Sequence, residues 1–507
     1  MTRLGFLIDQ DTCIGCHACT VACKSEHEVP LGVNRTWVKY IEKGTFPDAR
    51  RLFSVMRCNH CDDAPCMTIC PTGALFRRDD GIVDFDTASC IGCKSCMNAC
   101  PYDALYMDPE EHTAQKCNFC AHRVDVGLEP SCVVVCPTQS IITGDLDDPE
   151  SRIATMIARN GVRVRAPEQG TRPKLFYKGA DEASLDPHQT VIADDGMLWA
   201  ETTRDHPTLP AGTARDDVTA RTAYTTAHPM PWRGMVTAYL VTKAIAAGAL
   251  MVAALLVLLG HADVRAAVGL LPPVVAGAFT FATGVLLVAD LKQPTRFLYI
   301  LTRPNWSSWL TRGAVILSAC AAVEAAWFVA GLADADSAIR ALAGAGLVVG
   351  AATAGYTAFL FGQCEGRDLW QTRLLLPILL AQAAVAGAST FLVADLFLAV
   401  PSPDALRWVL LAGVGATAAL TATEVVSRST PQADLAVQAM TRGPYATRFW
   451  LGGVVLGHVV AAALAAVTLS GGPAPTAASA IAGLAAVAGL AAFEDAFVRA
   501  GQSIPLS

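Results

Sequence analysis

Cysteine is the residue type with the clearest chemistry in this sequence, because sixteen of the 18 cysteines form four groups of four between Cys13 and Cys136. The first and third groups have the spacing C-x2-C-x2-C-x3-C, which ligates cubane [4Fe–4S] clusters. In such runs three closely spaced thiolates bind one cluster, and the fourth binds the cluster of a partner group. The groups are Cys13, Cys16, Cys19 and Cys23; Cys58, Cys61, Cys66 and Cys70; Cys90, Cys93, Cys96 and Cys100; and Cys117, Cys120, Cys132 and Cys136. Sixteen thiolates at four per cluster predict four clusters, and a row of such clusters carries single electrons.

Disulfide bonds and zinc sites are the two other uses of cysteine to weigh. Disulfides need an oxidising compartment, and the first residues, MTRLGFLIDQDTC, contain no apolar export signal. Structural zinc sites use two C-x2-C pairs, whereas the first and third groups are four-cysteine runs, and the second, third and fourth groups end in Cys-Pro. Iron–sulfur clusters therefore remain the prediction. Cys320 and Cys364 lie in or beside apolar segments and are expected to pack as small hydrophobic residues.

Residues 1–145 contain all four groups and are predicted to form an α+β domain of duplicated ferredoxin-like units. The reason is that a cysteine run, a strand-like segment and a Cys-Pro turn recur along them. Residues 146–230 are polar and rich in Pro, Asp, Thr and Arg, and we expect a polar surface wrap and linker there. This stretch should include a short helix over 151–159 and an extended segment over 174–177.

Residues 231–507 are predicted to form an all-α bundle of eight membrane-spanning helices. Hydrophobic residues make up 53% of the protein, more than an ordinary soluble protein contains, and they gather here in segments long enough to span a bilayer. An even number of spans places both ends of the bundle on one side of the membrane. The predicted spans are 236–260, 268–289, 310–331, 339–361, 374–395, 405–424, 448–469 and 476–497.

The charge distribution bears on partners and on orientation. Residues 1–230 carry 23 Lys and Arg against 32 Asp and Glu, a balance that argues against nucleic acid as a partner. Eleven basic residues flank the spans on the side of the N-terminal domain and three lie on the opposite side. The positive-inside rule therefore predicts a multi-pass protein of the cytoplasmic (inner) membrane, with the cluster domain and both termini in the cytoplasm. The eleven are Arg233, Lys292, Arg296, Arg303, Arg312, Arg367, Arg373, Arg428, Arg442, Arg448 and Arg499, and the three are Arg265, Arg340 and Arg407.

The four-group layout resembles the four-cluster iron–sulfur subunits of molybdopterin oxidoreductases of the dimethyl sulfoxide and polysulfide reductase type. The stretch Cys136-Pro137-Thr138-Gln139-Ser140 after the last group resembles them as well. The membrane half is similar to the polysulfide-reductase-type membrane anchors, the NrfD family, in its eight spans and in Pro231-Trp232 before the first span. Together the two resemblances imply an iron–sulfur subunit fused to its membrane anchor.

The resemblance also implies how the cysteines are shared, with groups one and four, and groups two and three, exchanging their last members. The implied ligand sets are Cys13, Cys16, Cys19 with Cys136; Cys117, Cys120, Cys132 with Cys23; Cys58, Cys61, Cys66 with Cys100; and Cys90, Cys93, Cys96 with Cys70. It further implies a separate molybdopterin subunit, containing Mo or W, that handles the substrate. The sequence departs from the family where Lys24, in place of proline, follows Cys23, which is not expected to alter ligation.

Membrane anchors of this general kind occur with and without haem b. A haem with two histidine ligands needs a pair of well-placed intramembrane histidines. The membrane half has only His261, in a loop far from the clusters, and His458, within a span. We therefore expect no haem, and we expect the last cluster to exchange electrons directly with a lipid-soluble carrier, menaquinone or ubiquinone, near the cluster-facing ends of the helices.

Candidate residues for a quinone site lie at that end of the bundle. Ionisable residues inside a span are costly and are functional by default, which draws attention to Lys243, Glu324 and His458. Asp290 could pair with Arg296 or Arg312 to hold a quinone headgroup or its protons. The structural alternatives are an aromatic interface anchor for Trp232 and structural ion pairs for the acidic residues. The candidate set is Trp232, Tyr239, Lys243, Asp290 and Arg296.

The predicted function is an electron-transfer and membrane-anchor subunit that links a separate cytoplasmic molybdopterin enzyme to the membrane quinone pool. The sequence contains no nucleophile elbow, P-loop or dinucleotide fingerprint, so the primary substrate is assigned to the partner. A second hypothesis is a redox-driven proton-translocating module fed by another cytoplasmic donor, with Glu324 and Glu424 relaying protons. A third is an oxygen-sensing regulatory module, for which four clusters are more than sensing needs.

Overall fold

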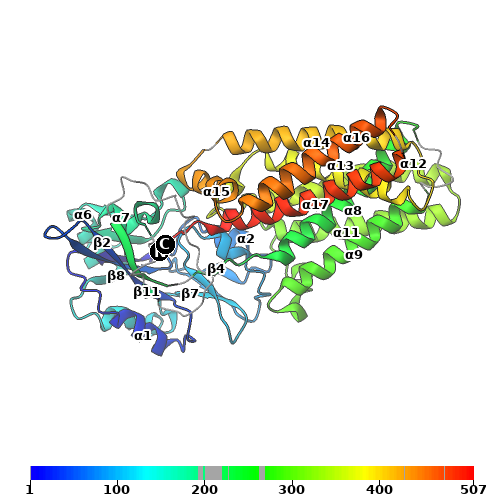
Figure 1. The fold of residues 1–507 in the computed structure, drawn as a ribbon. Helices are drawn as coiled ribbons and strands as arrows, with labels where there is room; N and C mark the ends of the chain where they lie inside the picture. The colour runs from blue at the N-terminus through cyan, green and yellow to red at the C-terminus, as the bar shows by residue number, and fades with distance from the viewer. Residues whose placement is uncertain are drawn as a thin grey trace.

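The computed structural model describes residues 2–191, 198–199, 220–226, 228–261, 269–427, 429–472 and 474–507. A domain of short strands and helices, drawn from blue to cyan in Figure 1, lies at one end of a bundle of long helices drawn from green to red. Arg265 and Arg428, both used for the orientation, fall outside the described residues. The two predicted architectures, a ferredoxin-like α+β part and a helical bundle, are confirmed.

The N-terminal domain is built on two four-stranded sheets. In the first, the order is β8 (Ile141–Asp145), β1 (Leu4–Asp9), β10 (Leu175–Lys178) and β9 (Val162–Arg163). Strand β1 is buried on both faces, because Leu7 packs under α6 (Arg152–Arg159) while Phe6 and Ile8 face the main core. The second sheet has the order β11 (Leu198–Trp199), β12 (Ala220–Thr225), β2 (Thr36–Lys43) and β3 (Arg50–Arg57).

The stretch expected to be a surface wrap and linker contributes strands to both sheets. Strand β10 is an inner strand that pairs in parallel with β1, and β12 pairs antiparallel with β2. This stretch is therefore part of the folded domain and not only a surface wrap, because Leu175 and Tyr177 are fully buried and fill the core beside β1. The expected short helix is present as α6, which Ser151 caps by accepting a hydrogen bond from the Ala154 amide at 3.2 Å.

Two ferredoxin-like repeats hold the middle cysteine groups. In each repeat a short helix, α2 (Pro65–Ile69) or α3 (Ser95–Ala99), leads to a Cys-Pro turn and then to a two-stranded hairpin. The first and last groups lie on α1 (Ala18–Glu26), α4 (Ala121–Val124) and α5 (Ser131–Val134) and in the turns beside them. The hairpins are β4 (Leu75–Arg77) with β5 (Val83–Phe85), and β6 (Leu105–Met107) with β7 (Ala114–Lys116).

Among the residues that the structure describes, eight helices are long and apolar enough to cross a bilayer, in agreement with the predicted count. They are α8 (Gly234–Leu258), α9 (Leu271–Asp290), α11 (Trp309–Leu332), α12 (Asp336–Gly362), α13 (Leu375–Ala394), α14 (Pro403–Val426), η5 with α16 (Arg448–Leu469), and α17 (Pro475–Ser503). Helix α8 is the central one and packs on α9, α12 and α13. Small residues permit that approach, since a Cβ atom on Gly248 would lie 1.8 Å from the Ala383 carbonyl oxygen.

The seventh spanning helix has an irregular first half. Residues Arg448–Val460 (η5) form a π-helix, and the α-helix α16 (Ala461–Leu469) continues it. The wider turns of η5 press against α17, where the Cα atoms of Gly457 and Gly489 leave no space for a side chain. The hydropathy pattern predicts this span but carries no sign of its π-helical geometry.

The two parts of the protein are joined through the loops that carry the middle cysteine groups. The indole Nε1 of Trp232 donates to the Cys93 carbonyl at 3.2 Å, and the side-chain amide of Asn305 donates to the Cys70 carbonyl at 2.8 Å. The amide of Gly366 donates to the Ala99 carbonyl at 3.2 Å. Because backbone groups of these loops are bonded directly to the bundle, the second and third cysteine groups are held against its end.

Candidate functional site

The structure brings the sixteen cysteines into four sets, each containing three members of one group and one member of another. All of them are free thiols. Electrostatic interactions between thiols of different groups, such as Cys13 with Cys136, Cys23 with Cys117, Cys66 with Cys100 and Cys93 with Cys70, indicate the sets. These sets coincide with the sharing that the family resemblance implies. We name them set I (Cys13, Cys16, Cys19, Cys136), set II (Cys23, Cys117, Cys120, Cys132), set III (Cys58, Cys61, Cys66, Cys100) and set IV (Cys70, Cys90, Cys93, Cys96).

The donor chemistry of the sets fits iron–sulfur clusters. Burial, with the neighbouring Cys58 thiol as the next cause, raises the pKa of Cys61 to about 12. Burial and the Cys70 thiol likewise raise the pKa of Cys93 to about 12. Four such thiols cannot all ionise together unless positive charge is placed among them, and bound iron provides it by holding the sulfurs as thiolates. When bound, such clusters supply one-electron carriers.

The four sets form a row. Cys19 of set I is an electrostatic neighbour of Cys132 in set II. Cys117 of set II has the same relation to Cys58 in set III. Cys96 of set IV has Cys66 of set III among its neighbours. The order along the row is therefore I, II, III and IV.

The two ends of the row have different surroundings. At the set I end Cys16 is exposed, and the apolar side chains of Ile14, Val21 and Val134 around it are 56%, 65% and 59% exposed. At the set IV end Cys93 lines a large cavity within the helical bundle. One end is therefore open to another protein, and the other end reaches the membrane half.

The cavity at the set IV end has a volume of about 1060 Å³ and lies among α8, α9, α11 and α12. It begins at Cys93 and Trp232 and extends to Glu324 on α11. Its walls are mainly apolar, and Phe281 and Val285 on its α9 wall are 75% and 50% exposed. A long apolar molecule from the bilayer can enter such a cavity sideways.

Three of the five predicted quinone residues line this cavity, namely Trp232, Tyr239 and Asp290. Arg296 does not, because its guanidinium donates to the Thr87 and Cys90 carbonyls at 2.7 and 3.0 Å. The predicted pairing of Asp290 with Arg296 or Arg312 is not found. Asp290 instead forms an ion pair with Lys94, which lies between two cysteines of set IV, at 2.8 Å.

Lys243 also lies outside the cavity wall, on the inner side of α8. Its ammonium group donates to the Ala354 carbonyl at 3.2 Å and to the Thr357 hydroxyl, and it lies 4.9 Å from the centre of the Tyr356 ring. Glu494 on α17 is an electrostatic neighbour of this ammonium group, without an ion pair between the two among the described contacts. Lys243 is thus buried in the bundle core, one residue layer behind the cavity.

Several residues that line or flank the cavity were not predicted from the sequence. Lys94 and Ser95 follow Cys93, and Tyr356 lies on α12. At the deep end lies Glu324, which the sequence did single out, and its carboxylate accepts hydrogen bonds from the Thr280 hydroxyl at 2.8 Å and from the Cys320 thiol at 3.3 Å. Lys94 and Asp290 are 196 residues apart, so only folding places them together.

His458 is engaged within η5. Its Nδ1 atom lies 2.7 Å from the Gly453 carbonyl oxygen, and its Nε2 atom lies 3.2 Å from the Thr417 hydroxyl. Both ring nitrogens are therefore used in hydrogen bonds with the protein.

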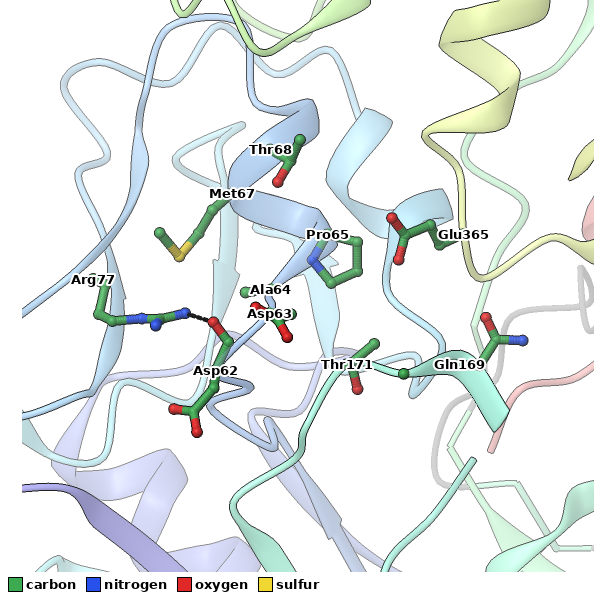
Figure 2. A pocket seen from close by; sticks show the side chains of 11 residues that line it. Asp62, Asp63, Ala64, Pro65, Met67, Thr68, Arg77, Gln169, Thr171 and Glu365 are labelled. Atoms are coloured by element: carbon green, nitrogen blue, oxygen red, sulfur yellow. Dashed lines mark hydrogen bonds between the residues drawn. The ribbon is translucent and has the colours of Figure 1, made fainter. Parts of the chain in front are cut away.

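A second pocket, of about 720 Å³, lies on the surface between the cluster domain and the loop that follows α12. Figure 2 shows Asp62, Asp63 and Arg77 on one side of it and Glu365 on the other. The Arg77 guanidinium donates to the backbone carbonyls of Cys61 and Asp62, and Arg172 pairs with Asp63. Its lining is polar and acidic, which suits neither an apolar carrier nor a lipid tail.

Four sets of cysteines in a row, ending at an apolar cavity among spanning helices, define a membrane-bound iron–sulfur protein. Comparison with known proteins agrees. Descriptions of 4Fe-4S dicluster domains match residues 12–75 and 49–146. The family described as polysulphide reductase, NrfD matches residues 223–503, more than half of the sequence, and the protein belongs to that family.

The N-terminal part is similar to two reductase subunits and to the protein NrfC. The B subunit of tetrathionate reductase from Salmonella typhimurium is 44% identical over 189 residues, which cover 36% of this protein and 76% of the relative. The arsenate respiratory reductase iron–sulfur subunit, ArrB, of Shewanella sp. is 36% identical over 225 residues, covering 34% and 95%. The protein NrfC of Escherichia coli is 42% identical over 177 residues, covering 34% and 79%. The protein thus joins an iron–sulfur subunit and an NrfD-type anchor in one polypeptide.

Proposed function

We propose that this protein is the electron-transfer and membrane-anchor subunit of a respiratory molybdopterin-type oxidoreductase. It passes electrons through four [4Fe–4S] clusters, ligated by sets I to IV, between a separate catalytic subunit and the membrane quinone pool. The observation that carries the proposal is the unbroken order of the sets from the exposed Cys16 to Cys93 in the wall of the apolar cavity.

The catalytic subunit docks at the set I end. Electron transfer needs close approach to the first cluster, and Cys16 provides the exposed point of the row. Exposed apolar side chains such as Val21 and Val134 favour a protein partner there, because apolar patches on a protein surface mark binding sites. The names of the relatives, which are components of tetrathionate and arsenate reductases, support a partner that contains Mo or W and handles the substrate.

The quinone, menaquinone or ubiquinone, binds in the cavity with its headgroup at the set IV end. Its reduction takes two electrons, delivered one at a time, together with two protons, and its oxidation returns them. Tyr239 and Trp232 line that end, and the Asp290 carboxylate, held by Lys94, is the charged group beside it. The proposed role of Asp290 is to hold a proton at its carboxylate for exchange with the headgroup.

The proposed orientation places the cluster domain and both termini in the cytoplasm. It rests on the asymmetry of basic residues, eleven on the cluster side against three on the far side. In Figure 1 the cluster domain and the C-terminal end of α17 lie at the same end of the bundle. Labelling of single cysteines introduced at Phe46 and at Leu398 from either side of sealed vesicles tests the orientation, because these exposed residues belong to opposite ends.

The proposal is tested by metal analysis of the complex purified anaerobically from its own membranes. We expect about sixteen irons per polypeptide and about one Mo or W, held in a second protein. Sixteen irons without Mo or W would agree with four clusters that transfer electrons but would contradict the proposal of a molybdopterin partner. Zinc in place of iron would contradict the proposal at its first step.

A second candidate function is redox-driven proton translocation, which a series of buried polar side chains behind the cavity favours. Tyr239 and Tyr356 line the cavity, and the Lys243 ammonium group lies 4.9 Å from the centre of the Tyr356 ring. The Lys243 ammonium group also donates to the Thr357 hydroxyl, and Glu494 on α17 is an electrostatic neighbour of Lys243. These contacts lead from the quinone cavity into the core of the bundle.

The two carboxylates predicted to relay protons occupy other places. Glu324 faces the deep end of the cavity, and Glu424 accepts a hydrogen bond from the Thr372 hydroxyl near the cluster side. In sealed vesicles we expect Glu494→Gln to lower the number of protons released per electron while Glu424→Gln leaves it unchanged. Wild-type vesicles that show only the proton uptake of quinone reduction would contradict translocation.

A further inference from the structure

Arg57 is a buried cation at the middle of the row of cysteines. It is the last residue of β3, directly precedes Cys58 and is 1% exposed. Its Nη1 atom donates a hydrogen bond to the Cys132 sulfur at 3.0 Å, and its guanidinium carbon lies 4.7 Å from the centre of the Phe6 ring. The side chain is thus fixed between the sheet and set II.

Among the described residues the charge of Arg57 is compensated by cysteine sulfur and by the Phe6 ring, and Arg57 forms no ion pair with a carboxylate. Its strongest charged neighbours are Cys132 and Cys117 of set II and Cys19 of set I. Within the described residues its Nε and Nη2 atoms find no hydrogen-bond acceptor. A buried cation with unpaired donors is costly, and the cost is offset when an anionic cluster with sulfide and thiolate acceptors occupies set II.

The other buried cations near the cysteines differ from Arg57. Lys94 is neutralised by Asp290 at 2.8 Å. The Lys116 ammonium group donates to the backbone carbonyls of Val83 and Cys117 rather than to a sulfur. Among the described hydrogen bonds of buried basic side chains, that of Arg57 to Cys132 is directed at a cysteine sulfur.

We propose that Arg57 raises the reduction potential of the cluster in set II, so that an electron moving along the row rests there. Reduction transfers one electron from the neighbouring cluster, which is oxidised, to the set II cluster, which gains one negative charge. A fixed positive charge and N–H···S hydrogen bonds both stabilise the more negative, reduced state. Arg57 acts as a positioning residue, through its effect on the reduction potential of the cluster. No proton is transferred, and no bond is formed or broken.

This inference rests on the proposed ligation of four clusters, and its experiment separates the two. The purified complex of the Arg57→Gln variant is titrated at controlled potentials, and the reduced fraction of each cluster is followed by electron paramagnetic resonance. We expect the reduced-to-oxidised ratio of one cluster to fall at least tenfold at a given potential, equivalent to about 59 mV for one electron. The other three clusters should change less than threefold.

Arg35→Gln is the matched control. Arg35 is also buried and also lies over an aromatic ring, Phe85, but it donates to neutral side chains, to Gln115 at 2.7 Å and to Tyr106 at 3.3 Å. We expect all four ratios of this variant to stay within threefold of the wild type. Equal changes at all clusters, or no change at any, in Arg57→Gln would overturn the inference.

Arg57→Lys decides the matter if Arg57→Gln fails to load iron. Lysine keeps the positive charge without the planar guanidinium, so the ratio of the set II cluster should remain within threefold of the wild type. A tenfold fall in Arg57→Lys would show that the positive charge does not set the potential and would overturn the inference. A wild-type protein with fewer than four clusters would contradict the proposed function instead.

Discussion

At the scale of single residues, each cysteine set combines ligands that are near in sequence with one ligand from a distant part of the sequence. Three thiols of each set come from one cysteine group, and in sets I and IV their C-x2-C-x2-C spacing by itself indicates the cluster. The fourth thiol comes from another group, as Cys100 does for set III. Burial and the surrounding thiols raise the pKa of Cys96 well above its usual range, so metal binding is what keeps such a thiol ionised.

The sharing of ligands is tested by pairs of substitutions. Cys58→Ala and Cys100→Ala should each remove the set III cluster, about four irons, and abolish the same electron paramagnetic resonance signal. Cys96→Ala should remove a different signal, although Cys96 and Cys100 belong to one run. Loss of the same signal in Cys96→Ala and Cys100→Ala would contradict the sharing.

Asp290 is the residue with the most specific proposed role at the cavity. Asp290→Asn keeps the shape of the side chain while removing its charge and its ion pair with Lys94 at 2.8 Å. We expect quinone-coupled turnover to fall at least tenfold while all clusters remain reducible by dithionite. Asp434→Asn, on a helix outside the cavity wall, is the control, and equal turnover in the two variants would remove Asp290 from the site.

At the scale of elements, the spans were predictable because a bilayer requires about 20 consecutive apolar residues in a helix, and the sequence supplies eight such segments. The inner position of β10 was not predictable, since its four residues resemble any short extended segment until they pair with β1. The π-helical turns of η5 depend on the close contact of Gly457 with Gly489, which a hydropathy pattern does not record.

The central helix α8 depends on a close approach that a methyl group would block. In Gly248→Ala the new Cβ atom would lie 1.8 Å from the Ala383 carbonyl oxygen, so α8 and α13 must separate. We expect a loss of about 1–3 kcal/mol in the free energy of unfolding, seen as a lower midpoint of thermal unfolding in detergent. Gly344→Ala, where nothing lies within 4 Å of the new atom, should show no such loss.

At the scale of the whole molecule, the last residues of the sequence join the two parts. Residues Ile504–Ser507 are buried, and the Leu506 amide donates to the Asp103 carboxylate at 3.2 Å. The Arg367 guanidinium donates to the Ile504 carbonyl at 3.0 Å. These contacts fix the loop that carries Cys100 against the end of the bundle, and no local sequence motif indicates them.

Removing residues 504–507 should therefore weaken the coupling between the two parts without emptying the clusters. We expect the iron content to be unchanged and the oxidation of the reduced clusters by quinone to slow at least severalfold, because set IV is less firmly held at the cavity. Removal of iron together with the tail would show instead that the tail is needed for the cluster domain to fold.

The most direct measurement of the central claim is the oxidation of the reduced clusters by an added quinone in Gly284→Trp and Gly415→Trp. Both glycines are exposed and have open space around them, but only Gly284 lines the cavity. The indole at position 284 should fill the quinone site and slow the oxidation at least tenfold, with Gly415→Trp matching the wild type and dithionite reducing the clusters of all three proteins. Equally fast oxidation by quinone in Gly284→Trp and in the wild type would contradict the account that electrons leave set IV through this cavity.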